Sequence, residues 1–220
     1  MKATEIPLPA LCPAHVVVVH GWGLSSFATG YWCHRLAQSG LAPAPFSYRS
    51  LRRSLDDNVA RLAVHVQALG TDRPVHLAGH SLGGIMIMQC LARHRFANLG
   101  RVVMVGTPFQ GSATAQKLKT TRYGKLLLGK TLVQWNGVNP ADLPPGLEVG
   151  TIAGTSPLGV GRLIALLETP HDGTVSLSET HVPFATDRMV MRVTHSEMLI
   201  SAALTQQIER FLTTGRFLHQ

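Results

Sequence analysis

The chain has few cysteines, no long apolar run and no apolar segment at its start, and each shortage excludes a class of protein. The three cysteines, Cys12, Cys33 and Cys90, are an odd number without the spacing of a metal site, so neither a disulfide framework nor a metal centre is expected. We expect each to be a small buried apolar side chain. No apolar run approaches the ~20 residues that span a bilayer, which predicts no transmembrane segment. Without a secretory signal, the predicted location is cytoplasmic.

Acidic and aromatic residues are also scarce. The 20 Lys and Arg outnumber the 12 Asp and Glu, and the formal net charge is +8. Nucleic acid would match that charge, but aromatic residues make up only 6% of the chain and no nucleic-acid-binding motif is present. Basic residues cluster no more densely than at Arg49, Arg52 and Arg53. The charge therefore predicts an anionic substrate, carrier or membrane surface as partner, and no nucleic acid.

What the chain does contain is a regular alternation of short apolar runs and amphipathic segments. The first apolar run, Val16 to Val19, is continuous and β-branched, as in a strand buried on both faces. Alternation of this kind predicts βαβ units, and so an α/β fold with a mostly parallel central sheet flanked by helices. The length of 220 residues suits one domain, 1–220. Strands are predicted over 16–19, 44–48, 75–78, 101–105, 146–154 and 188–193, and helices over 31–39, 54–69 and 82–94.

One pentapeptide, Gly79-His80-Ser81-Leu82-Gly83, lies between a predicted strand and a predicted helix. Its glycines permit a tight turn. The serine at the apex would lie at the amino end of the helix, whose dipole favours developing negative charge. The alternative is that Ser81 only caps the helix. Because apolar runs stand on both sides of the turn, the context favours Ser81 as a nucleophile.

A serine hydroxyl needs a base, a group that orients the base, and donors for the oxyanion that forms. The donors are expected in the His20-Gly21-Trp22-Gly23 segment, which follows the first predicted strand. The backbone N–H of Leu82, directly after the nucleophile, is one predicted donor. The N–H of Trp22 is the preferred second donor, and that of Gly23 is the alternative.

The base is expected to be a histidine near the end of the chain, after the last strand. Among 11 histidines, His195 has the right position, because it directly follows the strand predicted over 188–193. His171 and His181 are the competitors, and neither follows a convincing strand. Thr194 or Ser196 would cap the helix predicted to begin here.

The orienting acid is expected on the loop after the preceding strand. Asp172 lies there, and the following Gly173 indicates a sharp turn. Asp187 and Glu179 are alternatives in poorer contexts, and Asp142 precedes the strand. An ordinary Asp-Gly turn is the plain interpretation of Asp172. The chain order Ser, Asp, His favours the catalytic one.

Residues 113–145 break the alternation. They are basic and partly apolar, and they follow a core strand at the edge where the other motifs gather, so a small cap or lid is predicted. A solvated helix with its leucines against the core is the alternative. The residues concerned are Lys117, Lys119, Arg122, Lys125, Lys130, Leu118, Leu126, Leu127, Leu128, Leu132 and Trp135.

Four motifs make the chain resemble the α/β-hydrolase superfamily, and within it the bacterial lipase and esterase group. They are Val19-His20-Gly21-Trp22-Gly23, Gly79-His80-Ser81-Leu82-Gly83-Gly84, Gly106-Thr107-Pro108-Phe109-Gln110-Gly111-Ser112 and His171-Asp172-Gly173-Thr174-Val175. The resemblance implies Ser81 as nucleophile, His195 as base and Asp172 as orienting acid. It implies no cofactor and no metal.

A serine hydrolase that cleaves small-molecule or lipid acyl esters is the function that this resemblance implies. Thioesterase and acyltransferase variants, for example on an acidic acyl carrier protein, stay open, as does a non-catalytic binding protein that kept the fold. Substrate contacts are expected from Trp22, Phe109, Leu126 and Trp135.

Overall fold

A single parallel sheet organises the chain. The computed structural model describes residues 13–121, 128–131, 137–158 and 167–219, and within these the strand order is β2-β1-β3-β4-β5-β6. Every neighbouring pair is parallel. The strands are β1 His15–Val19, β2 Ala42–Phe46, β3 Val75–His80, β4 Leu99–Val105, β5 Val149–Gly154 and β6 Asp187–Met191. The helices are α1 Gly30–Gln38, α2 Leu55–Gln67, α3 Leu82–Arg93, α4 Ala113–Lys119 and α7 Ala202–Thr214, with 3-10 turns η1 Ser26–Thr29, η2 Pro140–Asp142 and η3 Glu197–Leu199.

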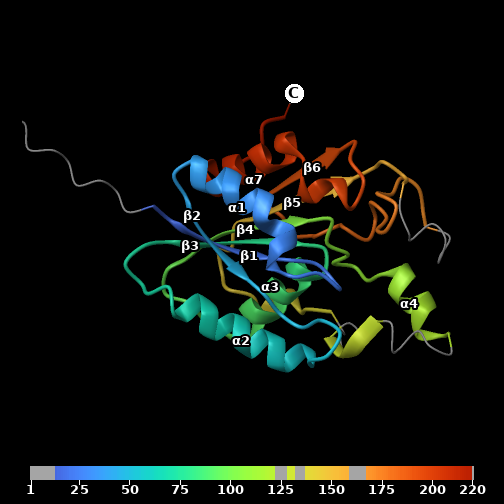
Figure 1. Ribbon diagram of the computed structural model, residues 1–220, viewed down its shortest axis with the longest axis horizontal. Helices are drawn as coiled ribbons and strands as arrows, with labels where there is room; N and C mark the ends of the chain where they lie inside the picture. The colour runs from blue at the N-terminus through green and yellow to red at the C-terminus, as the bar shows by residue number, and fades with distance from the viewer. Residues whose placement is uncertain (1–12, 122–127, 132–136, 159–166, 220) are drawn as a thin grey trace, which may run out of the picture.

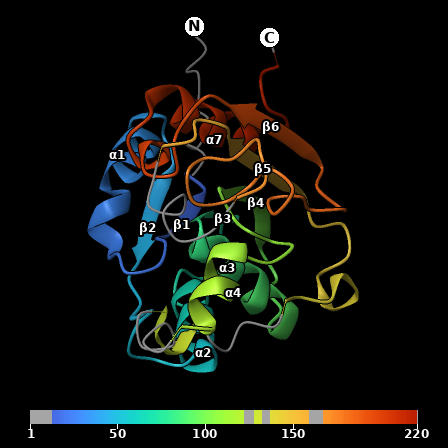
Figure 2. The same ribbon diagram turned by 90° about the vertical axis from the view of Figure 1, so that its right-hand side faces the viewer.

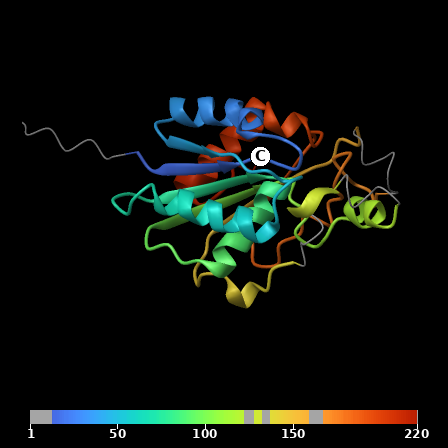
Figure 3. The ribbon, with the colours of Figure 1, turned by 60° about the horizontal axis from the view of Figure 1, so that its bottom comes forward.

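Helices cover both faces of the sheet. Helices α1 and α7 lie on one face and α2 and α3 on the other (Figures 1 and 3). Successive valines of β1 divide between the two layers: Val17 and Val19 belong to the core beneath α2 and α3, and Val16 and Val18 to the core beneath α1 and α7. Side chains alternate across a strand, so a continuous valine run supplies both cores. The predicted α/β fold with a parallel sheet flanked by helices is confirmed.

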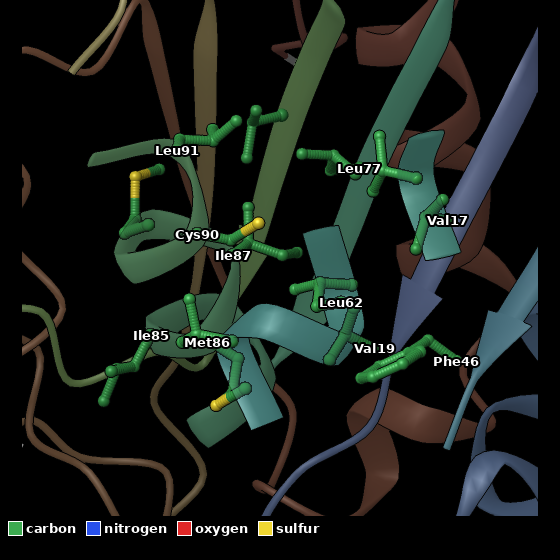
Figure 4. Packing of buried hydrophobic residues seen from close by; sticks show 14 of the residues in the cluster. Val17, Val19, Phe46, Leu62, Leu77, Ile85, Met86, Ile87, Cys90 and Leu91 are labelled. Atoms are coloured by element: carbon green, nitrogen blue, oxygen red, sulfur yellow. The ribbon is translucent and has the colours of Figure 1, made fainter. Parts of the chain in front are cut away.

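The core beneath α2 and α3 fixes the strand and helix that carry Ser81. Leu77 of β3, Leu62 of α2 and Ile87 of α3 meet there with relative exposures of 1% or less (Figure 4). Burying such a side chain stabilises the fold by roughly 1.5–3 kcal/mol. Since α3 is buried along almost its whole length, the turn between β3 and α3 is held from both ends.

Several predicted boundaries differ from the structure by a few residues, and two of the differences have a clear physical cause. Strand β2 begins at Ala42, ahead of the predicted 44–48 range, because Pro43 and Pro45 pair with β1 alone at the edge of the sheet. An edge strand tolerates proline, since it needs N–H groups on one side only. The helix predicted directly after His195 is only the 3-10 turn η3, and α7 begins later, where the Ser201 hydroxyl accepts a hydrogen bond from the N–H of Leu204 at 3.3 Å.

The carboxyl ends of the strands gather the loops that carry the predicted chemistry. All strands run in one direction, so the loops after β1, β3, β4 and β6 share one edge of the sheet. Helix α4 lies beyond this edge in Figures 1 and 3, and Figure 2 looks at the edge with α4 in the foreground. No helix in the described part of the chain has the length and apolarity needed to cross a bilayer.

Candidate active site

The turn between β3 and α3 holds Ser81 in a strained conformation. Its φ is 53° and its ψ is −121°, and it is the one residue other than glycine with positive φ in the described ranges. A backbone of this kind costs about 1–3 kcal/mol and persists only where the surroundings enforce it. The Ser81 hydroxyl makes no capping hydrogen bond to α3, so the capping interpretation does not account for this residue.

Glycines allow the turn to pack closely against its neighbours. A β-carbon at Gly83 would overlap the carbonyl oxygen of Val19, and one at Gly84 would overlap the hydroxyl of Thr107. Helix α3 therefore begins against the ends of β1 and β4. This contact brings the loop after β1, which contains Gly21 and Trp22, to the side of Ser81: a β-carbon at Gly21 would lie 3.2 Å from the β-carbon of Ser81.

Two hydrogen bonds join the buried Asp172 to the half-buried His195. His195 Nδ1 lies 2.7 Å from Asp172 Oδ2, and the His195 N–H donates to the Asp172 carbonyl oxygen at 2.9 Å. Asp172 is fully buried. Its other carboxylate oxygen, Oδ1, accepts hydrogen bonds from the backbone N–H groups of Thr174 and Val175 at 2.9 and 2.8 Å. With Oδ1 engaged, Oδ2 is directed at the imidazole.

The pair lies next to the serine turn. The Ser81 N–H donates to the carbonyl oxygen of Val105 at 2.8 Å. Gly106 follows, with φ of 55°, and a β-carbon there would lie 3.2 Å from Nδ1 and Cε1 of His195. Ser81 and His195 therefore flank the same Val105–Gly106 segment at the end of β4. A side chain at Gly106 would press on Met198 Sδ, at 2.8 Å, and crowd the imidazole of His195.

His20 anchors the loop after β1. Its Nε2 accepts a hydrogen bond from the Tyr48 N–H at 3.2 Å, so the ring proton is on Nδ1, which donates to the Gly21 carbonyl oxygen at 2.8 Å. The Tyr48 hydroxyl donates to the His20 carbonyl oxygen at 3.1 Å, and the two rings stack 4.4 Å apart. Burial lowers the pKa of His20, so the neutral form is retained. This role of His20 was not predicted from the sequence, because its partner Tyr48 lies on another loop.

The two backbone N–H groups predicted as oxyanion donors make no hydrogen bond within the described part of the chain. In the described part of the chain, neither the Trp22 N–H nor the Leu82 N–H donates to a protein acceptor. The N–H of Gly23, the alternative donor, is engaged by the Ser50 hydroxyl at 2.9 Å. The geometry therefore favours Trp22 over Gly23 as the partner of Leu82.

The other histidines and acids considered for the roles of base and orienting acid make hydrogen bonds elsewhere. His171 Nδ1 accepts from the Gly173 N–H at 3.0 Å and so supports the Asp172 turn. The Glu179 carboxylate accepts hydrogen bonds from the N–H groups of Ser176 and Ala113. His181 contacts Arg188, Asp187 binds the Phe217 N–H and His219, and Asp142 lies in η2. Of the predicted candidates, only Asp172 hydrogen-bonds His195.

The predicted substrate contacts have different surroundings. Trp22 is 41% exposed and its indole N–H donates to the Leu128 carbonyl oxygen at 2.8 Å. Phe109 packs edge-on against Phe184, with ring centroids 5.6 Å apart. Leu126 and Trp135 lie outside the described residues. A hollow of about 300 Å³ lies beside the loop after β1, lined by Gly23, Leu24, Tyr48, Leu51 and their neighbours.

A larger hollow of about 440 Å³ lies at the amino ends of the strands, lined by His76, Phe96, Arg101, Glu148 and neighbouring residues. It is at the opposite edge of the sheet from Ser81 and has no part in this site. No group of three or more His, Cys, Asp or Glu side chains with the arrangement of a metal site occurs within the described ranges.

Comparisons with known proteins agree with this fold. A family model described as "Alpha/beta hydrolase family" matches residues 16–200. No curated protein sequence matches the chain. Among solved structures, the propeptide form of Bacillus licheniformis lipase BlEst2 is 20% identical with a TM-score of 0.82, over 98% of this chain and 53% of that one. This chain thus spans about half of the propeptide form.

Two further structures are similar over nearly all of both chains. The mature form of the same lipase is 21% identical with a TM-score of 0.72, and the match covers 97% of this chain and 96% of that one. The RedJ thioesterase from the prodiginine biosynthetic pathway in Streptomyces coelicolor is 15% identical with a TM-score of 0.59, over 98% and 90% of the two chains. At these identities the likeness concerns the fold.

Proposed function

Because the chain belongs to the alpha/beta hydrolase family, we propose that it is a serine hydrolase that cleaves carboxylic esters through an acyl-enzyme. The observation that carries the proposal is the hydrogen-bonded Asp172–His195 pair beside a strained Ser81. A receptor with this fold needs no nucleophile, base and acid in one place, so this combination favours catalysis over binding alone.

In the proposed reaction, the Ser81 hydroxyl oxygen attacks the ester carbonyl carbon while His195 Nε2 takes the hydroxyl proton. Asp172 Oδ2 accepts a hydrogen bond from the Nδ1–H of His195, so the proton stays on Nδ1 and the lone pair is on Nε2. The carbonyl oxygen becomes an oxyanion and accepts hydrogen bonds from the N–H groups of Trp22 and Leu82. The C–O bond breaks and the alcohol leaves with the proton from His195. Water then attacks the acyl-enzyme by the same steps, releasing the acid and free Ser81.

The apolar and basic surroundings favour an acyl substrate with an anionic carrier or surface. Leu24 and Leu51 line the hollow beside the oxyanion loop together with Arg49 and Arg52. Residues 113–145 are proposed as a small cap, because α4 lies beyond the edge of the sheet that carries Ser81 (Figure 2). Within the described part of this segment, Leu128 is buried and Lys130 exposed.

A thioesterase is the second candidate, and the similarity to the RedJ thioesterase over nearly the whole chain favours it. Ester and thioester cleavage use the same nucleophile, base and oxyanion donors, and they differ in the leaving group. An acyl group on an acidic carrier protein would match the net charge of +8. A cytoplasmic location, predicted from the sequence, would suit such a carrier.

Labelling with a fluorophosphonate tests the nucleophile. The reagent should attach to Ser81 in the wild-type protein and not in Ser81→Ala, and that variant should lose on the order of 10³-fold or more in ester hydrolysis while keeping its fold. A panel of nitrophenyl esters from acetate to palmitate, with matched acyl thioesters, would identify the acyl chain and the leaving group. Activity of Ser81→Ala within tenfold of wild type would refute the assignment.

A further inference from the structure

We propose that His80, the residue before the nucleophile, is a positioning residue that sets the place of His195 relative to Ser81. The proposal rests on the proposed hydrolase function and adds to it a residue outside the predicted triad. It follows from where the two nitrogens of the His80 ring lie.

His80 Nε2 lies 3.0 Å from the main-chain carbonyl oxygen of His195. A carbonyl oxygen only accepts hydrogen bonds, so the ring proton of neutral His80 is on Nε2 and is donated to His195. The two imidazole rings also contact each other, with centroids 4.7 Å apart. Burial, with a smaller contribution from His195, lowers the pKa of His80 to about 3, so the ring is uncharged near neutral pH.

This hydrogen bond differs in kind from those that Asp172 makes. Asp172 holds the side chain and the N–H of His195, and both bonds come from the loop that follows β5. His80 is joined to Ser81 by a peptide bond, and it holds the carbonyl group of His195. Asp172 therefore holds the base from the loop after β5, and His80 ties the base to the strand that carries the nucleophile.

The other ring nitrogen makes a histidine here hard to explain by stability. His80 Nδ1 is buried and lacks any hydrogen-bond partner in the described part of the chain. A buried acceptor without a donor costs about 1–3 kcal/mol. An apolar side chain of similar size would fill the site without that cost. A histidine at this position is explained if its Nε2–H is required as the hydrogen-bond donor to the His195 carbonyl oxygen.

The unpaired nitrogen also faces the oxyanion loop. A β-carbon at Gly21 would lie 2.9 Å from His80 Nδ1, so the ring occupies space that only glycine leaves open. On its other side, His80 meets the edge of Trp32, with centroids 6.2 Å apart. The ring is thus held between α1, the oxyanion loop and His195, and its tilt is fixed by packing.

Two variants of equal length separate positioning from packing. His80→Gln keeps an N–H donor at the reach of Nε2, and His80→Met keeps the bulk without a donor. His76→Met is the matched control, since His76 is also a buried histidine of β3 but lies at the opposite edge of the sheet, where its Nδ1 accepts the Arg101 N–H.

We expect His80→Met to lower kcat for nitrophenyl butyrate about 10–100-fold, because small displacements of a catalytic group cost up to about 10²-fold. KM should stay within about twofold, since the His80 ring is buried and is not among the proposed substrate contacts. His80→Gln should recover most of kcat, and the rate of fluorophosphonate labelling should follow the same order. Urea unfolding should show no loss of stability to match the loss of kcat, because Met removes the unpaired Nδ1 from the core while it gives up one hydrogen bond.

Several results would overturn the inference. Loss of kcat below twofold in His80→Met would show that the donor is not needed, and equal losses in Gln and Met would assign the residue to packing. A loss in His76→Met as large as that in His80→Met would mean that destabilisation alone reduces activity. If wild-type Ser81 takes no fluorophosphonate, the hydrolase proposal itself fails. If it is labelled at the same rate in wild type and His80→Met, only the positioning role fails.

Discussion

Replacing Asp172 by asparagine should disable His195 while leaving the fold unchanged, and the hydrogen bonds around the carboxylate say why. Oδ1 accepts from the N–H groups of Thr174 and Val175, at 2.9 and 2.8 Å. An asparagine must keep its oxygen at that position, because its amide nitrogen cannot accept from either N–H. Its NH₂ group would then occupy the place of Oδ2 and face His195 Nδ1, now 2.7 Å from Oδ2.

An amide N–H directed at Nδ1 requires an unprotonated Nδ1, so the proton of the neutral ring moves to Nε2. His195 would then have no lone pair toward Ser81 and could not act as its base. We expect kcat/KM for a nitrophenyl ester to fall about 10³–10⁴-fold near neutral pH, which corresponds to about 4–5.5 kcal/mol in the barrier. The free energy of unfolding should change by less than about 1 kcal/mol, since two of the three side-chain hydrogen bonds survive.

The assay is steady-state hydrolysis together with urea unfolding of the same preparations. Asp187→Asn and Glu179→Gln are the matched controls, because both carboxylates accept backbone N–H groups away from His195. Both should keep activity within a few-fold of wild type. If Asp172→Asn keeps more than a tenth of the activity, or if either control is the more damaging change, the tautomer argument is wrong.

Three further outcomes are expected. Gly21→Val should reduce ester hydrolysis more than Trp22→Ala. A β-carbon at Gly21 would press on His80 Nδ1 at 2.9 Å, whereas Trp22 is proposed to act through its backbone N–H. The measurement is kcat of the two folded variants, and the reverse order would assign the indole ring a direct role. Burial lowers the pKa of His76 from 6.5 to about 4. Between these pH values His76 is protonated in the unfolded chain and neutral in the folded chain. The contribution of neutral His76 to the free energy of unfolding should be complete above pH 6.5 and should fall by about 1.4 kcal/mol per pH unit toward pH 4. Between pH 7 and pH 5, the free energy of unfolding in urea should fall less in His76→Met than in the wild type. An equal fall in the two proteins would contradict this role of His76. Finally, kcat/KM for an acyl group on an acidic carrier should fall as the salt concentration rises. The double variant Lys117→Gln, Lys119→Gln should lower kcat/KM for this substrate in the same way and leave neutral-ester turnover unchanged. Equal salt responses of the two substrates would show that these lysines only form a solvated helix face.

The parts of the fold that depend on near neighbours were predictable from the sequence. The alternation of apolar runs and amphipathic segments gave the parallel sheet with helices on both faces, because side-chain periodicity is set within each element. The existence of a turn at Ser81 was equally predictable, from the glycines after it and the apolar run before it. Its strained backbone was not, because the turn packs against Val19 and Thr107 at the ends of other strands. The edge strand β2 begins at Ala42 and not at the predicted residue 44, because an edge strand tolerates Pro43, and its place at the edge is known only from the sheet order.

Partners that come from distant segments needed the tertiary structure. The sequence by itself determined that an acid and a histidine should follow the last strands, but Glu179 and Asp187 remained open beside Asp172. Only the order of strands in the sheet brings the Asp172 turn to His195.

The same holds for the smaller decisions at the site. The Gly23 N–H is removed from the oxyanion donors by Ser50 of another loop, and the contact of His80 with the carbonyl group of His195 joins segments far apart in the chain. A run of residues encodes its own periodicity and turns, because these depend on neighbours along the backbone. Which polar groups then meet is decided by how the strands are ordered and how closely glycines let them pack, and that is a property of the folded chain alone.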